Sequence, residues 1–338
     1  MKRFSLDKTS RKMPKPFRTI VVIGLLSAAS LSFADAEEAR KLPRIGQLYM
    51  GSPLVQQPYD GALRDGLRSL GYIDGKTVVF IARYANGDYT QFPHLARELI
   101  EAKVDALVVS TAGVQAALQA TQTIPIVAPS MSDPIRDGLV TSLAHPGGNL
   151  TGGTGMGPDT DSKRLQFAME LVPGLKRVGL LYDATNPQFD NGAAASRVLA
   201  NGLGLTLHTY GVRNVDEMRS AFARFDKDRI QALVVWPTPL MLLHRQSILD
   251  VTSRKIPVIA EGAEFAQAGA LISYSADYVE MWRHAAVHVD KILKGSKPGD
   301  LPIERPTKFV LRVNLKTAKE LSITIPESIL VQADEVIR

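Results

Sequence analysis

Short apolar runs rich in β-branched residues alternate along this 338-residue chain with segments whose apolar residues recur at helical spacing. Within residues 105–110 the four residues from Ala106 to Val109 form a continuous apolar run, which is typical of a parallel strand covered on both faces. In residues 59–70, Leu63, Leu67 and Leu70 fall on one helical face, and Gly71 ends the pattern. This alternation of strands and helices predicts doubly wound parallel α/β sheets.

The same patterns set the expected elements. In the first half we expect strands over 45–50, 77–83, 105–110 and 124–130, with helices over 59–70, 93–102 and 114–121. In the second half we expect strands over 177–182, 205–210, 232–236, 257–260, 271–274 and 308–313, with helices over 159–171, 192–203, 215–225, 240–254, 279–293 and 315–321.

The two halves repeat each other. Residues 104–110 are echoed by 230–236, and each run is followed by a helix and then by an Ile-Pro strand, at 124–128 and 256–260. This repetition predicts two lobes of similar architecture. Open parallel sheets bind ligands at the carboxyl ends of their strands, so two such lobes would face each other across a cleft.

A glycine-rich stretch over residues 147–159 separates the halves. Six of its thirteen residues are Gly, and Pro158 lies near its end. Glycine adopts backbone angles that other residues avoid, so the stretch predicts a turn or hinge at the first crossover between the lobes.

The N-terminus has the order of a secretory signal peptide. A basic segment precedes an apolar run over 20–33, and Ala34-Asp35-Ala36 offers a cleavage site. The alternative is a membrane anchor, although the run is short for a bilayer span. We therefore expect cleavage near Ala36 and treat residues 1–36 as the export signal.

Removing that segment changes the charge. The first 36 residues hold seven of the 40 Lys and Arg but only two of the 34 Asp and Glu, so the remainder has a net charge of +1. This balance does not support a nucleic-acid partner. The chain has no Cys, and therefore no disulfide, thiolate metal site or lipid-anchor cysteine. We expect an unlipidated protein of the periplasm.

Three ordered motifs resemble those of a known family. They are DGALRDGLRSLGY at 60–72, DPIRDGLV at 133–140 with PGGNLTG at 146–152, and a C-terminal signature that runs from KILKG at 291–295 to Ile325-Pro326. The family is that of the ABC-transporter substrate-binding proteins that include the tryptophan-binding TrpX-like members. The resemblance extends over about residues 43–337.

The resemblance implies a type I periplasmic-binding-protein fold, with a three-crossover hinge near 155, 275 and 305. Lobe 1 would comprise 37–154 and 276–305, and lobe 2 would comprise 155–275 and 306–338. It also implies a monomeric receptor that captures a small molecule, such as an amino acid or an aromatic or organic acid, for an ABC permease in the inner membrane. The alternative is a ligand-sensing module that docks on a membrane sensor.

The cleft should be lined by the residues that follow each strand. Hydroxyls and free backbone N–H groups there would hold a carboxylate, rings would stack on a flat ligand, and Glu261, Asp133 or Asp183 would meet an amine. The candidates are Ser52, Ser110, Thr111, Ala112, Ser130 and Asp133 from lobe 1, and Tyr182, Asn186, Trp236, Thr238, Glu261 and Tyr274 from lobe 2. The alternatives are that Thr111 only caps its helix, Asp133 caps a turn, Trp236 packs in the core and Glu261 lies in an exposed loop.

Motifs of catalysis and of cofactor binding are absent. The sequence has no G-x-S-x-G, no Walker A motif and no H-E-x-x-H, so we expect neither enzymatic activity nor a cofactor. His284 and His288 have the i, i+4 spacing of metal ligands, but no third ligand is nearby in the sequence, which favours an ordinary helix face and no metal.

Overall fold

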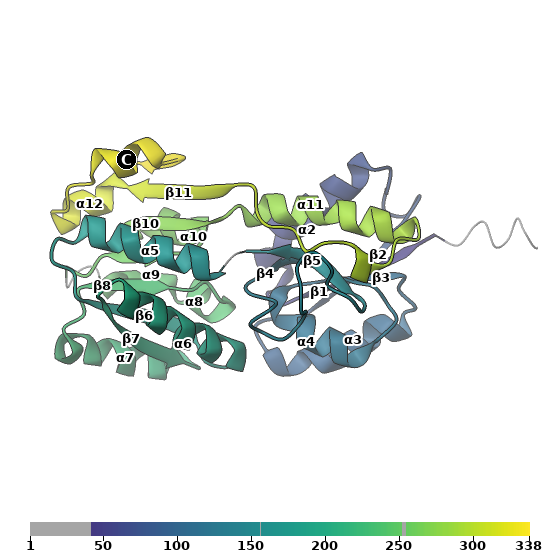
Figure 1. The fold of residues 1–338 in the computed structure, drawn as a ribbon, viewed down its shortest axis with the longest axis horizontal. Coiled ribbons are helices and arrows are strands. Elements are labelled where there is room, and N and C mark those ends of the chain that lie inside the picture. Colours follow the sequence, from purple (N-terminus) through teal and green to yellow (C-terminus); the bar gives the residue numbers. More distant parts are fainter. Residues whose placement is uncertain (1–41, 156, 252–254) are drawn as a thin grey trace, which may run out of the picture. The chain divides into compact units, whose positions relative to one another are not determined.

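The computed structural model describes residues 42–155, 157–251 and 255–338, whose strands form one sheet of five and one of seven (Figure 1). The expectation of two α/β lobes with parallel sheets is therefore confirmed. The expected signal peptide over 1–36 lies outside the described residues. Within the described ranges, no helix combines the length and the apolar character that crossing a membrane requires.

The first sheet is parallel throughout, in the order β2-β1-β3-β4-β5. Its strands are β1 (Arg44–Tyr49), β2 (Val79–Tyr84), β3 (Ala106–Val109), β4 (Ile126–Met131) and β5 (Leu150–Thr154). The four residues of β3 are all fully buried, as its continuous apolar run predicts.

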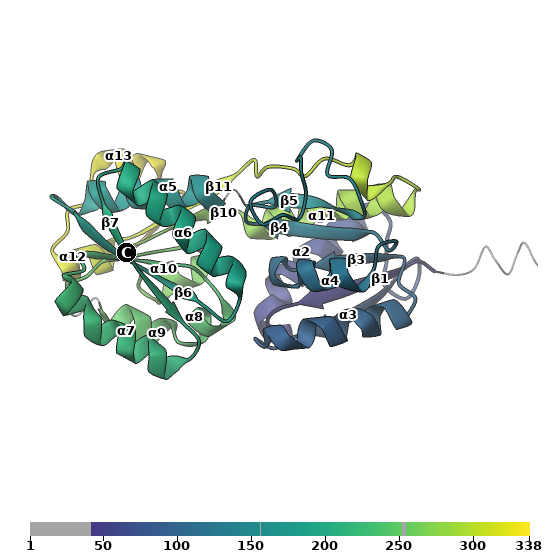
Figure 2. The same ribbon diagram turned by 60° about the horizontal axis from the view of Figure 1, so that its bottom comes forward.

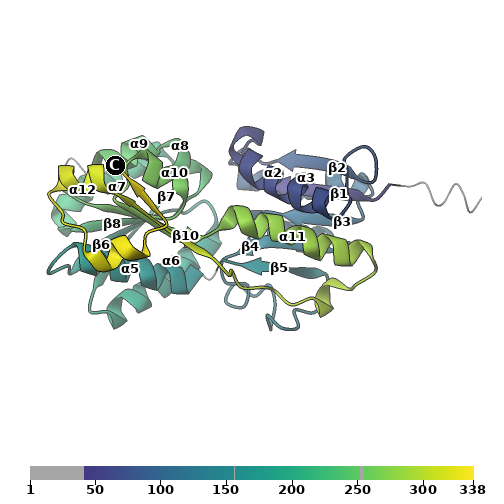
Figure 3. The same cartoon turned by 90° about the horizontal axis from the view of Figure 1, so that it is seen from above.

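Helices cover both faces of this sheet (Figures 2 and 3). On one face, Ala106 and Val108 pack with α2 (Pro53–Ser69) and α11 (Tyr278–Leu293). On the other face, Leu107 and Val109 pack with α3 (Phe92–Glu101) and α4 (Val114–Ala120). Helix α11 comes from late in the chain, so the first lobe is completed only after the second sheet has been entered.

The second sheet has the order β12-β11-β10-β9-β8-β6-β7. Its strands are β6 (Arg177–Asp183), β7 (Thr206–Val212), β8 (Ala232–Val235), β9 (Val258–Ala260), β10 (Ile272–Ala276), β11 (Phe309–Asn314) and β12 (Glu335–Ile337). All neighbouring strands are parallel except β10 and β11. This antiparallel pair and β12 were not expected from the sequence, because strand direction and a three-residue strand leave no periodic signal.

Helices also cover both faces of the second sheet. On one face lie α5 (Gly157–Leu171) and α6 (Pro187–Gly202), and on the other lie α7 (Val215–Asp228), α8 (Pro239–Leu243), α9 (Arg245–Leu249) and α10 (Ala263–Ala268). Helices α12 (Leu315–Leu321) and α13 (Glu327–Gln332) pack by β10 and β11. Short 3₁₀ helices span Tyr89–Gln91, Thr111–Gly113 and Pro298–Asp300.

The prediction of one helix over 240–254 was wrong. The chain leaves helical geometry at His244, where α8 ends and α9 begins, and residues 252–254 lie outside the described residues. Thr238 caps the start of α8, because its Oγ1 accepts a hydrogen bond from the Met241 N–H at 3.3 Å. The apolar residues over this span continue at helical spacing, so the interruption at His244 is invisible to periodicity.

The glycine-rich stretch contains more than the expected turn or hinge, because residues 150–154 form the buried strand β5 and the chain crosses to the second sheet only after it. The need for glycine within β5 is clearest at Gly152. Its φ is +137°, and a Cβ there would lie 2.0 Å from the carbonyl oxygen of Ala128. Glycine therefore permits β5 to pair closely with β4 where the register shifts at a bulge.

The chain passes between the sheets three times, after β5, after β10 and before β11 (Figure 1). Backbone hydrogen bonds tie these connections together. The Thr154 N–H donates to the Glu304 carbonyl at 2.9 Å, and the Asp277 N–H donates to the Lys308 carbonyl at 3.0 Å. His284 Nε2 also lies 2.6 Å from the Glu304 carboxylate, which joins α11 to the third connection.

Gly66 lies where α2 packs tightly against α11. A Cβ at this position would lie 2.4 Å from the Arg283 carbonyl oxygen and 2.9 Å from the Ala286 Cβ. We expect Gly66→Ala to lower the free energy of unfolding by about 1–3 kcal/mol, because the helices must move apart.

Gly61→Ala on the same helix is the matched control. No atom lies within 4 Å of a Cβ there, so the better helix propensity of Ala should stabilise the protein, by up to about 1 kcal/mol. Denaturant unfolding of both variants measures the difference. Equal effects in the two variants would contradict the proposed close approach.

Candidate ligand-binding site

A cavity of about 270 Å³ lies where the carboxyl ends of strands from the two sheets meet. Residues after β1, β3 and β4 line it from the first lobe, and residues after β6, β8 and β9 line it from the second. Helices α2, α5, α6, α8, α10 and α11 also contribute to the wall. Pockets at facing strand ends are the usual ligand sites of open α/β sheets.

Hydroxyl groups form part of the first-lobe wall. Thr111 Oγ1 donates a hydrogen bond to the Ser130 carbonyl at 2.7 Å, and Ser110 Oγ donates to the Leu48 carbonyl at 3.2 Å. Neither hydroxyl caps the short helix that follows β3. Because both protons are directed at backbone oxygens, these two side chains offer lone pairs, and not protons, to the cavity.

Aromatic rings make up much of the remaining wall. Those lining the cavity are Tyr59, Tyr89, Phe189, Trp236, Tyr278 and Trp282. The Trp236 ring centroid lies 6.1 Å from that of Phe189, and the Tyr59 centroid lies 5.9 Å from that of Trp282. Rings of this size supply the apolar area with which a pocket encloses a flat ligand.

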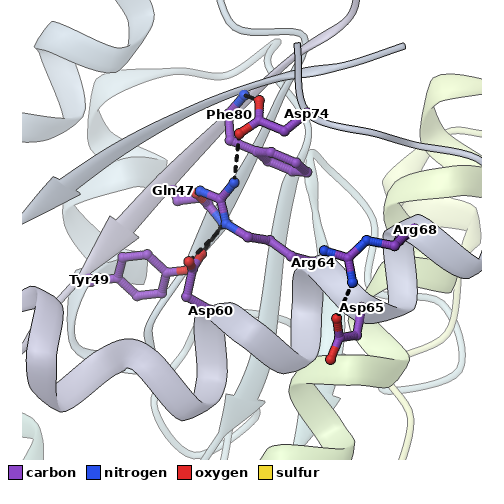
Figure 4. Close-up of polar contacts among 8 residues, drawn as sticks. All are labelled: Gln47, Tyr49, Asp60, Arg64, Asp65, Arg68, Asp74 and Phe80. Atoms are coloured by element: carbon purple, nitrogen blue, oxygen red, sulfur yellow. Dashed lines mark hydrogen bonds and ion pairs between the residues drawn. The ribbon is translucent and has the colours of Figure 1, made fainter. Parts of the chain in front are cut away.

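Trp282 is supported from behind by a buried polar network. Its ring stacks on Tyr49 at 5.4 Å between centroids. As Figure 4 shows, the Asp60 carboxylate accepts hydrogen bonds from Tyr49 Oη at 2.8 Å, Gln47 Nε2 at 2.7 Å and Arg64 Nε at 2.8 Å. Burial and Asp60 raise the pKa of Tyr49, so its phenol keeps its proton and its place in the stack.

Arg164, on α5, is the only fully buried cation of the cavity wall as described. Its Nη2 donates to Asp161 Oδ1 and lies 3.1 Å from Glu261 Oε2, while Nη1 donates to the Tyr274 carbonyl at 2.8 Å. Asp161 also accepts hydrogen bonds from Trp236 Nε1 at 2.9 Å and from Ser196 Oγ at 2.7 Å. Burial alone would lower the pKa of Arg164, but the two carboxylates raise it, so the guanidinium stays charged.

Glu261 connects this network to the other lobe. Its Oε1 accepts a hydrogen bond from Tyr278 Oη, at the start of α11. Burial, and then Glu261, raise the pKa of Tyr278 well above its ordinary value, so this phenol remains a donor. At another point of the cleft, Tyr89 Oη of the first lobe lies 3.5 Å from Asp183 Oδ2 of the second.

Eight of the residues predicted from strand ends line the cavity. They are Ser110, Thr111, Ala112, Ser130, Asn186, Trp236, Thr238 and Glu261.

The other four do not line it. Ser52 lies in an adjoining groove, and Asp133 Oδ1 caps a turn by accepting from the Arg136 N–H at 3.0 Å. The Tyr182 hydroxyl donates to Asp190 of α6 at 2.7 Å, because its ring lies on the face of β6 that α5 and α6 cover. Strand β10 continues past Tyr274 to Ala276, and the Tyr274 ring packs between Phe167 and Phe309.

Sequence reasoning missed the cavity residues that lie on helices, among them Asp161, Arg164, Tyr278 and Trp282. One available signal is that α5 and α11 both begin directly after a crossover between the lobes. The first turn of such a helix must lie close to the cleft. Which of its side chains face the cleft depends on where the helix starts, and that position shifts by one or two residues in sequence-based prediction.

The family model described as "ABC transporter substrate binding protein" matches residues 51–337. A tyrosine-binding protein from Clostridioides difficile is 26% identical over 324 residues, which cover 91% of this chain and 93% of that protein.

Solved structures agree in fold. A domain from Streptococcus pneumoniae, crystallised in complex with L-Trp, is 26% identical with a TM-score of 0.80, covering 88% of this chain and 100% of that one. The branched-chain amino acid transporter substrate binding protein LivJ of the same species, in complex with isoleucine, is 16% identical with a TM-score of 0.57, covering 77% and 86%. The type I periplasmic-binding-protein fold is confirmed.

The ion pairs that Arg164 forms with Asp161 and Glu261 should contribute to the stability of the fold. Arg164→Met keeps most of the side-chain volume but leaves Asp161 and Glu261 without their cation. We expect a loss of about 3–5 kcal/mol in the free energy of unfolding at pH 7, since an uncompensated charge stays buried.

Arg219→Met is the matched control, because Arg219 pairs with Asp216 on the exposed surface of α7. Surface pairs contribute little, so this variant should unfold almost like the parent protein. Urea unfolding of both variants measures the effect. A small loss in Arg164→Met would mean that the network is not required for the fold.

Proposed function

Because the chain belongs to the family of ABC transporter substrate binding proteins, we propose that it captures an amino acid in the cavity between its lobes and delivers it to an ABC permease. The observation that carries this proposal is the combination, in one enclosed space, of aromatic rings with the carboxylate of Glu261. An amino acid with a flat side chain presents the matching groups, a ring and an ammonium.

The relatives support the same ligand class. One is a tyrosine-binding protein, and another was crystallised with L-Trp. The cavity of about 270 Å³ is close to the lower end of ordinary ligand pockets, which suits a single amino acid better than a large cofactor. In this proposal the ligand ring lies among Trp236, Trp282 and Tyr59, and the ammonium lies at Glu261.

The two lobes should close on the ligand by bending at the three crossovers. A ligand that contacts both lobes stabilises the closed arrangement by its differential affinity for it. Tyr89 and Asp183 would add to that arrangement, because their contact joins the two sides of the cleft.

The cellular part of the proposal follows from the N-terminal segment and the family. The protein would be exported, released by cleavage near Ala36, and act in the periplasm as a monomer. Its permease would recognise the closed, loaded form.

Calorimetric titration tests the ligand class. We expect L-tyrosine or L-tryptophan to bind with one site per chain and to raise the unfolding free energy, by about 2.7 kcal/mol when the free ligand is at 100 times its dissociation constant. Trp236→Ala should weaken binding by at least about tenfold, since truncating a buried aromatic anchor typically costs 2 kcal/mol or more.

Tyr210→Phe is the control for this series. Tyr210 is a buried lobe-2 residue whose hydroxyl donates to Asp228 at 2.7 Å, and it does not line the cavity. Loss of this hydroxyl should lower the free energy of unfolding and leave the dissociation constant of the amino acid unchanged. Failure of all twenty amino acids to bind the folded protein would refute the proposed ligand class.

A further inference from the structure

The charges that line the cavity are unbalanced. They are Arg136, Asp137, Asp161, Arg164, Glu261 and Glu264, two cations against four carboxylates. Neither Lys nor His lines the cavity as described. The formal excess is therefore two negative charges inside a partly enclosed, mostly apolar space, where charge interactions are stronger than in water.

Both cations are already neutralised within the protein. Arg136 Nη2 lies 2.9 Å from Asp137 Oδ1, and Arg164 lies between Asp161 and Glu261. Arg164 Nε has no hydrogen-bond partner, but this atom is itself enclosed. The Nε and Nη2 groups of Arg136 both contact Asp137 Oδ1, so the edge with which arginine usually binds a carboxylate is occupied in Arg136 and enclosed in Arg164.

One carboxylate of the cavity has no partner of its own. Glu264, in the first turn of α10, is half-buried, and its carboxylate forms no hydrogen bond or ion pair with any residue described. Its Oε2 lies over Gly262, 2.8 Å from the position that a Cβ would take there. Glu264 therefore presents an unpaired negative charge at the cavity wall.

The phenol of Tyr59 faces the same region from the first lobe. Tyr59 lines the cavity together with Glu264 and Glu261, and burial, followed by these two carboxylates, raises the pKa of Tyr59. The Tyr59 hydroxyl has no hydrogen-bond partner in the described part of the chain. Tyr59, Trp282 and Tyr278 line the same cavity as the two glutamates, and the faces of aromatic rings attract cations.

The Ser110 and Thr111 hydroxyls of the first lobe do not offset the excess of negative charge. The hydroxyl protons of Ser110 and Thr111 point at backbone carbonyls, which leaves their lone pairs toward the cavity. Neither of these two hydroxyls therefore offers its proton to a ligand carboxylate.

We propose that the site, if it takes an amino acid as argued above, selects its ligand by the positively charged amine at Glu261 and Glu264, and does not depend on the ligand carboxylate. The chemical class is an arylalkyl ammonium compound, of which an aromatic amino acid is one member and the corresponding amine without a carboxylate is another. The proposal rests on the proposed function for the location of the site but differs from it in the group that is recognised.

Three probes with the same ring separate the possibilities: L-tyrosine, tyramine, which lacks the carboxylate, and 3-(4-hydroxyphenyl)propionate, which lacks the amine. Titration calorimetry on the wild-type protein is expected to give tyramine a dissociation constant within about tenfold of that of L-tyrosine. The propionate should bind at least about 100-fold more weakly, because a second anion would enter a site that already holds unpaired negative charge.

Glu264→Gln tests the residue directly. Because this carboxylate has no partner in the free protein, its neutralisation should leave the fold intact while weakening tyramine by about tenfold or more. Glu327→Gln is the matched control. Glu327 occupies the first turn of α13, a helix of the same six-residue length, and it is exposed and does not line the cavity. It should leave tyramine binding unchanged.

Each outcome decides one of the two proposals. If L-tyrosine and the propionate bind but tyramine does not, the amine inference is wrong and the amino-acid receptor remains. If tyramine binds and no amino acid does, the inference holds and the amino-acid function is wrong. Equal effects of Glu264→Gln and Glu327→Gln, or binding of none of the three probes, would overturn the inference.

Discussion

The buried guanidinium of Arg164 ties helix α5 to the carboxyl end of β9 and to β10 in the second sheet. It reaches Asp161 on its own helix, Glu261 after β9 and the Tyr274 carbonyl in β10. Removing a charged group from water is unfavourable unless its charge and its donors are satisfied, so these partners are fixed relative to one another. Through Asp161 the network also orients the Trp236 ring, and through Glu261 it reaches Tyr278.

The same residues link the cavity to the crossovers. Tyr278 is the first residue of α11, directly after the second crossover, and its ring packs on Gly155 of the first. A Cβ at Gly155 would lie 3.2 Å from the Tyr278 hydroxyl, so the small residue permits the two connections to touch. A ligand at Glu261 is therefore one hydrogen bond away from the segments about which the lobes would move.

The sequence pattern predicts most of the fold because buried strands and amphipathic helices leave local signals. The run at 105–110 and its echo at 230–236 identify β3 and β8, and the residues after them, Ser110 and Trp236, reach the cavity wall because chain order alone puts them at a strand end. Strand direction in β11 and the close pairing of β5 leave no such signal. They depend on contacts between distant segments, such as Gly152 against Ala128.

The helical half of the site escaped prediction for a related reason. Whether Asp161 or its neighbour faces the cavity depends on the residue at which α5 begins. Tyr182 shows that even a residue at a strand end can point away from the cavity, since its ring lies on the face of β6 that α5 and α6 cover. Recognition of a ligand in this cavity depends on which helical side chains face it, on which carboxylates remain unpaired and on where the hydroxyl protons point. Two proteins with the same residues after their strands could therefore recognise different groups of a ligand. In this chain the recognised group would depend on the unpaired Glu264 and on Arg136, which is paired with Asp137, and neither residue determines the fold.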